Sequence, residues 1–159
     1  MALAQDLLEQ ARHLANREPK RPKQASLKRA VSTAYYALFH LLTTAAVANW
    51  RTSRQRSELA RAFMHSAMKE ACKRTNNNTF STANPIQVRR LKRIANVFIR
   101  LQQQRETADY DNSIRWSRTE VLTLIDMVQE AFDLWSAICE DEIAEDFLLE
   151  LLVQKRRGG

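Results

Sequence analysis

Glycine and proline are scarce in this chain of 159 residues, which contains two glycines and three prolines. Both glycines, Gly158 and Gly159, lie at the C-terminus. All-β folds and glycine-loop nucleotide-binding folds need many turn residues, so this scarcity favours an all-α fold. It also excludes a GxGxxG motif and a P-loop, because both require glycines inside the chain.

Long apolar runs are missing as well. No stretch approaches the roughly 18 consecutive apolar residues that cross a bilayer. The first residues, MALAQDLLEQARHL, include Asp6 and Glu9, where a secretion signal has basic residues followed by an apolar segment. We therefore expect a cytoplasmic protein without a membrane partner.

The two cysteines, Cys72 and Cys139, form no CxxC pair and have no histidine-rich companion segment. Each falls at an apolar position of a predicted helix, so we expect both to be buried in the core. We predict neither a metal site nor a cofactor.

The net charge of +7 is divided unevenly along the chain. Residues 1–105 contain 20 Lys and Arg against 5 Asp and Glu, and residues 106–159 contain 5 against 13. The two parts therefore have net charges of +15 and −8. A strongly basic first part suits a polyanion such as RNA or DNA. The alternative is that the basic faces are only solvated, or pair with the acidic last helix.

Apolar residues recur every three or four positions, which predicts about five helices in one globular domain. The second is the most apolar and should lie at the centre of a bundle. The expected stripes are Leu3, Leu7, Ala11 and Leu14; Val31, Tyr35, Leu38, Leu42 and Ala45; Ala60, Phe63, Met64, Ala67 and Ala71; Leu91, Ile94, Phe98 and Leu101; and Val121, Leu124, Ile125, Val128, Phe132, Trp135 and Cys139.

Two helix starts have clear signals. Asn84 followed by Pro85 should begin the fourth helix after the loop-like run KRTNNNTFSTANP, and Ser117 with Glu120 forms a capping box for the fifth. We predict an all-α, up-and-down bundle of about five helices over residues 1–139. Residues 140–159 should form an acidic amphipathic extension with a basic tail, which either packs on the bundle or reaches a partner.

An arginine lies where the apolar stripe of the fourth helix should continue. Arg105 comes four residues after Leu101 and seven after Phe98. It either emerges at the end of the bundle and pairs with Asp109 at i+4, or faces a groove and binds a phosphate or carboxylate with two hydrogen bonds. Tyr110 follows, but a phenol with a pKa near 10 is a poor general base.

A polar row of Ser32, Tyr36 and His40 interrupts the apolar second helix. The row is either hydrogen-bonded within the core or borders the same groove as Arg105. The other two histidines, His13 and His65, are expected at the surface.

Several segments together resemble the small stand-alone proteins of the HEPN superfamily. These are AVSTAYYALFHLL on the second helix, His65 on the next, and R-x-x-A-D-Y-D at the end of the fourth, within residues 24–138. The resemblance implies a helical bundle that forms a symmetric dimer with a cleft at the interface. Many members are metal-independent endoribonucleases, often toxins encoded beside a nucleotidyltransferase-type antitoxin or acting in phage defence. Their signature is an Arg followed, after four to six residues, by a His; the Arg falls on Arg105, and Tyr110 replaces the His.

We therefore expect a HEPN-like protein that binds RNA or nucleotide phosphates and is at most a weak endoribonuclease, because a phenol does not titrate near neutrality as imidazole does. The alternative is a non-catalytic interaction protein, such as the partner subunit of a nucleotidyltransferase, with residues 140–153 as its docking helix. A DNA-binding helix-turn-helix lacks a convincing recognition helix here. The candidate site comprises Arg105, Asp109 and Tyr110 as catalytic residues and Tyr36, His40, Arg100 and Asp111 as substrate-binding residues.

Overall fold

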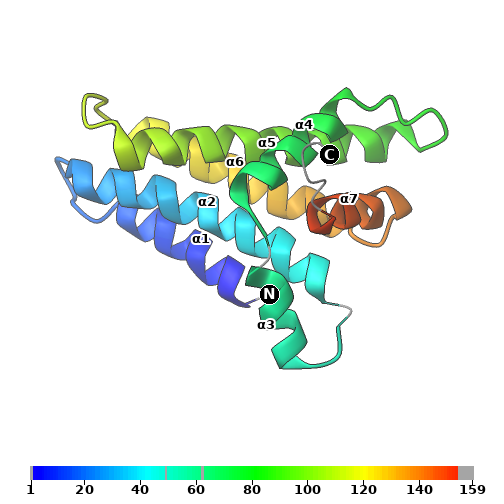
Figure 1. Cartoon of the computed structure of the whole chain (residues 1–159). Helices are drawn as coiled ribbons and strands as arrows, with labels where there is room; N and C mark the ends of the chain where they lie inside the picture. The colour runs from blue at the N-terminus through cyan, green and yellow to red at the C-terminus, as the bar shows by residue number, and fades with distance from the viewer. Residues whose placement is uncertain (1, 49, 62, 154–159) are drawn as a thin grey trace.

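The computed structural model describes residues 2–48, 50–61 and 63–153, and these form seven helices and no strand (Figure 1). The predicted all-α bundle is therefore confirmed. The helices are α1 (Ala2–Ala15), α2 (Gln24–Val47), α3 (Ser53–Arg61), α4 (His65–Asn77), α5 (Pro85–Tyr110), α6 (Arg118–Ile138) and α7 (Glu142–Leu152).

Helix α2 is the centre of the bundle and contacts α1, α3, α5, α6 and α7. Val31, Tyr35, Leu38 and Leu42 of the predicted stripe have no exposed surface. Among the described residues, α2 is the one helix long and apolar enough to cross a membrane, and 67% of that stretch is buried inside the bundle. Neighbouring helices on several sides account for its nearly all-round apolar composition.

The long helices α1, α2, α5 and α6 are held together at one end of the bundle. Figure 1 shows the α1–α2 and α5–α6 links at this same end. The Gln24 side chain donates to the main-chain oxygen of Trp116 and accepts from its N–H, both at 2.8 Å. The Arg118 guanidinium donates to the main-chain oxygens of Ala15, at 2.9 Å, and Glu18. These contacts fix the start of α2 and the α1–α2 link relative to the start of α6.

Both predicted helix starts are confirmed. Asn84 accepts a hydrogen bond from the N–H of Ile86 at 2.9 Å, with Pro85 as the first residue of α5. Ser117 and Glu120 form the reciprocal capping box of α6. Each cap satisfies main-chain N–H groups that the first helical turn leaves without a partner.

The predicted third helix is wrong, because two helices replace it. Helix α3 ends at Arg61, α4 begins at His65, and α3 has no buried residue. Phe63 lies between them and is buried, whereas Met64 is 57% exposed. Helix α4 also continues to Asn77, so the loop is shorter than its Asn-rich sequence suggested.

The apolar stripes of the first and last predicted helices also need correction. In α1, Ala11 is buried as predicted, but Leu3 is 56% exposed, and the other buried positions are Ala4, Leu8 and Ala15, each one residue after the predicted one. Cys139 is exposed because α6 ends at Ile138 and the chain turns away, whereas Cys72 is buried as expected. In α7 the buried residues are Ile143, Ala144, Phe147 and Leu151.

Helix α7 packs against α2, α4 and α5. Phe147 is 2% exposed and its ring lies 6.4 Å from that of Trp135 on α6. The extension was expected either to pack on the bundle or to reach a partner. The main apolar face of α7 packs on the bundle.

Candidate functional site

The site forms where α2 and α5 run antiparallel, and three successive contacts fix their register. Lys28 Nζ donates to Asn112 Oδ1 at 3.2 Å, and Ser32 Oγ donates to Asp109 Oδ1 at 2.5 Å. One turn further along α2, Tyr35 lies under the guanidinium of Arg105. Residues seventy or more positions apart in sequence therefore face each other in a defined order.

Arg105 is largely buried against two neighbouring tyrosine rings. Its side chain is 12% exposed, and its Cζ atom lies 5.2 Å from the ring centroid of Tyr35 and 5.8 Å from that of Tyr36. Its terminal nitrogen lies 3.5 Å from Asp109 Oδ2, and its Nε is buried without a hydrogen-bond partner. Of the two fates predicted for Arg105, the structure contains parts of both: an i+4 contact with Asp109, and a guanidinium with unused donor capacity.

Five ring-bearing side chains and three polar ones make up this site, which we call the Arg105 cluster. On α2 they are Ser32, Tyr35, Tyr36, Phe39 and His40; on α4, His65; and on α5, Arg105 and Asp109.

His65 joins the cluster through a hydrogen bond and a stacked ring. Its Nδ1 lies 2.5 Å from the hydroxyl oxygen of Tyr35, and its ring stacks on Phe39 with centroids 4.5 Å apart. Burial, together with repulsion from Arg105 and His40, lowers the pKa of His65 below its usual value. The imidazole is therefore favoured in its neutral form.

The hydroxyl of Tyr35 defines which nitrogen of His65 carries the proton. Tyr35 has no exposed surface, and burial raises the pKa of its phenol, so the hydroxyl keeps its proton. Among the described residues, Nδ1 of His65 is its hydrogen-bond partner. A hydroxyl that donates to Nδ1 places the imidazole proton on Nε2, which makes His65 a hydrogen-bond donor toward a ligand rather than a base.

His40 is the second imidazole of the cluster. Its ring lies 5.5 Å from Phe39 and 6.5 Å from Tyr36, measured between centroids. Burial lowers the pKa of His40, so it too is favoured as the neutral form. No hydrogen bond engages its ring within the described part of the chain, which leaves one nitrogen able to accept a proton.

The structure brings together four of the seven predicted site residues: Arg105, Asp109, Tyr36 and His40. Tyr110 is 78% exposed and shares with Arg105 the rim of a shallow depression that Glu106, Thr107 and Asp111 also line. It therefore lies beside the cluster.

Arg100 and Asp111 lie outside the cluster. Arg100 is exposed and, five residues before Arg105, is rotated about 140° around the helix. Asp111 is the C-cap of α5 and accepts from the N–H and hydroxyl of Ser113 at 3.0 and 2.5 Å. These two hydrogen bonds lower the pKa of Asp111.

Sequence reasoning placed Tyr35 in the core and His65 at the surface, and so missed their contact. No spacing rule links them, because His65 at the start of α4 reaches Tyr35 only once α4 has packed against α5. For Tyr35 one signal was available in the sequence. A tyrosine on a buried stripe needs a hydrogen-bond partner for its hydroxyl. For His65 the sequence offers no comparable signal.

A basic groove adjoins the cluster on the other side of α2. It has a volume of about 650 Å³ and runs between α1 and α2, where Arg17, Arg29, Ser32, Thr33 and Tyr36 are among its lining residues. Ser32 and Tyr36 belong both to this groove and to the Arg105 cluster. The guanidinium of Arg29 therefore extends the positive charge of the site along α2, whereas that of Arg17 lies 4.0 Å from a carboxylate oxygen of Glu18.

No group of three or more His, Cys, Asp and Glu side chains in the described residues could hold a metal ion. Comparison with protein-family models, with curated proteins and with solved structures finds no match to this chain. The resemblance to the HEPN superfamily therefore stays an expectation, and what the site does must be inferred from its own geometry.

Proposed function

We propose that the chain binds single-stranded RNA, or the phosphates of a nucleotide, at the Arg105 cluster. The observation that carries this proposal is the state of Arg105: a largely buried guanidinium with an unpartnered Nε and a single carboxylate at 3.5 Å. A buried charge is costly unless it is well paired. A phosphate oxygen would supply the missing acceptor through the planar donor fork of arginine.

The rings around Arg105 support a nucleic acid rather than a free anion. Tyr36, Phe39, His40 and His65 are half-buried, so part of each ring faces solvent. Stacking of a base on an aromatic ring is worth roughly 1–3 kcal/mol and depends little on sequence. The Nε2–H of His65 and the adjoining basic groove would add contacts to the backbone phosphates.

For catalysis, the arrangement supports at most slow, metal-independent RNA cleavage. His65 donates a hydrogen bond in its favoured tautomer, and Tyr110 lies beside the cluster with 78% of its surface exposed. His40 is then the group best able to remove a proton from a ribose 2′-hydroxyl. A poorly matched base costs a factor of roughly 10²–10⁴.

RNA binding with at most slow cleavage agrees with what we expect of a HEPN-like protein. Such a protein would act as a homodimer, in a toxin-antitoxin or phage-defence system, and a nucleotidyltransferase-type antitoxin would be its partner. The alternative of a purely non-catalytic partner subunit gains less support, because Phe147 and Leu151 of the supposed docking helix are buried.

Incubation of the purified protein with labelled single-stranded RNA in EDTA tests the proposal. We expect binding that Arg105→Ala weakens at least tenfold and that Arg89→Ala, an exposed arginine near the start of α5, weakens less than threefold. Cleavage, where it occurs, should persist in EDTA, be lost in His40→Gln, and survive in Tyr110→Phe. Equal affinity of Arg105→Ala and wild-type protein at low salt would refute the site.

A further inference from the structure

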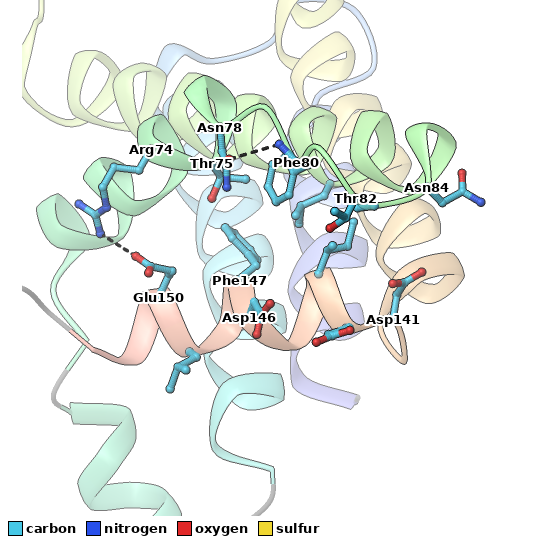
Figure 2. Close-up of a pocket in the computed structure, with 15 residues that line it drawn as sticks. Arg74, Thr75, Asn78, Phe80, Thr82, Asn84, Asp141, Asp146, Phe147 and Glu150 are labelled. Carbon is cyan, nitrogen blue, oxygen red and sulfur yellow. Dashed lines mark hydrogen bonds and ion pairs between the residues drawn. The ribbon is translucent and has the colours of Figure 1, made fainter.

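A second concave surface lies at the opposite end of α5 from the Arg105 cluster. It is a groove of about 750 Å³ between α7 on one side and the end of α4, the 78–84 loop and α5 on the other (Figure 2). Leu91 of α5 lines it, fourteen residues before Arg105, which corresponds to about 21 Å along the helix. The two surfaces are therefore separate.

One wall of the groove is acidic although the chain as a whole is basic. Glu142, Asp146 and Glu150 recur at intervals of four along α7, so their side chains form a row with a rise of about 6 Å per step. Glu150 pairs with Arg74 at 3.3 Å. Among the described residues, Glu142 and Asp146 have no ion-pair partner, and Asp141 at the start of α7 has none either.

The carboxylate of Asp141 also contributes negative charge to the groove. It occupies the N-cap position of α7, yet its side chain makes no capping hydrogen bond. Counting Arg74 as the one cation in the lining, the groove has a net charge of about −3, while the whole chain is at +7. A groove of opposite sign attracts ligands that the rest of the surface repels.

The floor and one rim of the groove are apolar. Leu91, Ile143 and Phe147 lie at the bottom with at most 8% of their surface exposed, and Phe80 is partly buried against the core. In Figure 2 the ring of Phe147 points from α7 toward Thr75 and Phe80 on the facing wall. Leu149, which also lines the groove, is 57% exposed and extends the apolar surface toward solvent.

We propose that this groove docks a short basic amphipathic segment of a partner protein. Lysine or arginine at i, i+4 spacing would match the row of carboxylates, and apolar side chains on the same segment would cover Leu149 and Phe80. The aliphatic stems of the basic residues would lie along the apolar floor while their charged ends reach the rim. A linear polyamine matches the charge but not the exposed Leu149, and a nucleic acid is repelled by the net charge.

The test uses the full-length chain and three labelled helical peptides of eighteen residues in a fluorescence anisotropy titration. The first peptide is built from Leu and Lys with Lys at i, i+4 spacing, the second replaces each Lys by Glu, and the third replaces each Leu by Gln. We expect the first alone to bind with a dissociation constant below 100 μM at low salt. Equal binding of the second or third would overturn the charge or the apolar part of the proposal.

Matched variants localise the binding. Glu142→Gln with Asp146→Asn should weaken the first peptide about tenfold, and Leu149→Ser about threefold. The control pair Asp133→Asn with Glu145→Gln removes the same charge from exposed positions outside the groove and should change affinity less than twofold.

Two further measurements, competition by spermidine and RNA binding, distinguish a protein segment from a small polycation and the groove from the Arg105 cluster. Spermidine that displaces the peptide at equal concentration would show that a small polycation suffices, and would overturn the proposal of a protein segment. The Glu142→Gln, Asp146→Asn variant should bind RNA like the wild type. Unchanged peptide affinity in this variant, with its circular dichroism spectrum intact, would place the peptide elsewhere and refute the groove.

Discussion

Replacement of Arg105 by methionine should separate stability from ligand binding at a single position. The contacts that stabilise the guanidinium are two tyrosine rings, at 5.2 and 5.8 Å, and one carboxylate at 3.5 Å. Cation–π contacts contribute about 0.5–2 kcal/mol each, and an ion pair of this kind a few tenths of a kcal/mol. Removing the charge from water costs several kcal/mol, and Nε is left without any partner.

These opposing contributions are similar in size, so Arg105→Met should change the free energy of unfolding by no more than about 1 kcal/mol. For a chain of this length that corresponds to a shift of about 2–4 °C in Tm. The same substitution removes charge-assisted hydrogen bonds to phosphate worth about 1.5–3 kcal/mol, which is a loss of roughly 10- to 150-fold in RNA affinity.

Urea denaturation and an RNA titration of the same two preparations measure both quantities. A variant destabilised by more than about 3 kcal/mol that still binds RNA like the wild type would refute the reasoning, because Arg105 would then be a structural residue.

Two further predictions concern the Tyr35–His65 pair, and a third concerns the packing of α7. Tyr35→Phe removes the partner of His65 Nδ1 and should cost about 1–2 kcal/mol of stability, with ¹⁵N NMR of the His65 ring showing mixed tautomers instead of one; an unchanged tautomer would contradict the assigned proton position. Because the pKa of His65 is lowered in the folded chain, its contribution to stability is complete above the unfolded value of about 6.5 and is lost as pH falls through that value toward the lower folded pKa. Urea denaturation at pH 7.5 and 5.5 should therefore show a smaller pH effect in His65→Gln than in the wild type, and equal effects would contradict this. Phe147→Ala should cost about 3–5 kcal/mol, whereas Leu149→Ala on the exposed face of α7 should cost less than about 0.5 kcal/mol; similar melting temperatures would show that α7 is not part of the cooperative unit.

The fold class and most of the core could be predicted because helical periodicity depends on local sequence alone. The stripes through Tyr35 and Phe98 are buried as expected, and the caps at Asn84 and Ser117 begin their helices where the spacing indicated. The break between α3 and α4 could not be predicted, because no glycine or proline marks it. In α1 only Ala11 was predicted correctly, since Leu3 and Ala4 fit a helical period equally well and only packing against α2 selects one.

The candidate site was predicted only in part, because periodicity describes contacts within one helix and not contacts between helices. Arg105 and Asp109 lie on one helix, and their i+4 relation can be derived from spacing. The contacts of Asp109 with Ser32 and of Tyr35 with His65 join different helices. Their register depends on how α2, α4 and α5 dock, which periodicity does not specify. Arg100 is an error of another kind. Its charge suggested that it belongs to the site, but its position around α5 directs its side chain away from the cluster.

The Nε–H resonance of Arg105 in a ¹H–¹⁵N spectrum tests the central claim most directly. Assigned by its absence in Arg105→Met, this signal should shift or gain protection from exchange when single-stranded RNA is added in EDTA, because phosphate supplies the acceptor that Nε lacks. A spectrum in which RNA moves the signals of exposed arginines and leaves that of Arg105 unchanged would contradict the proposed phosphate site.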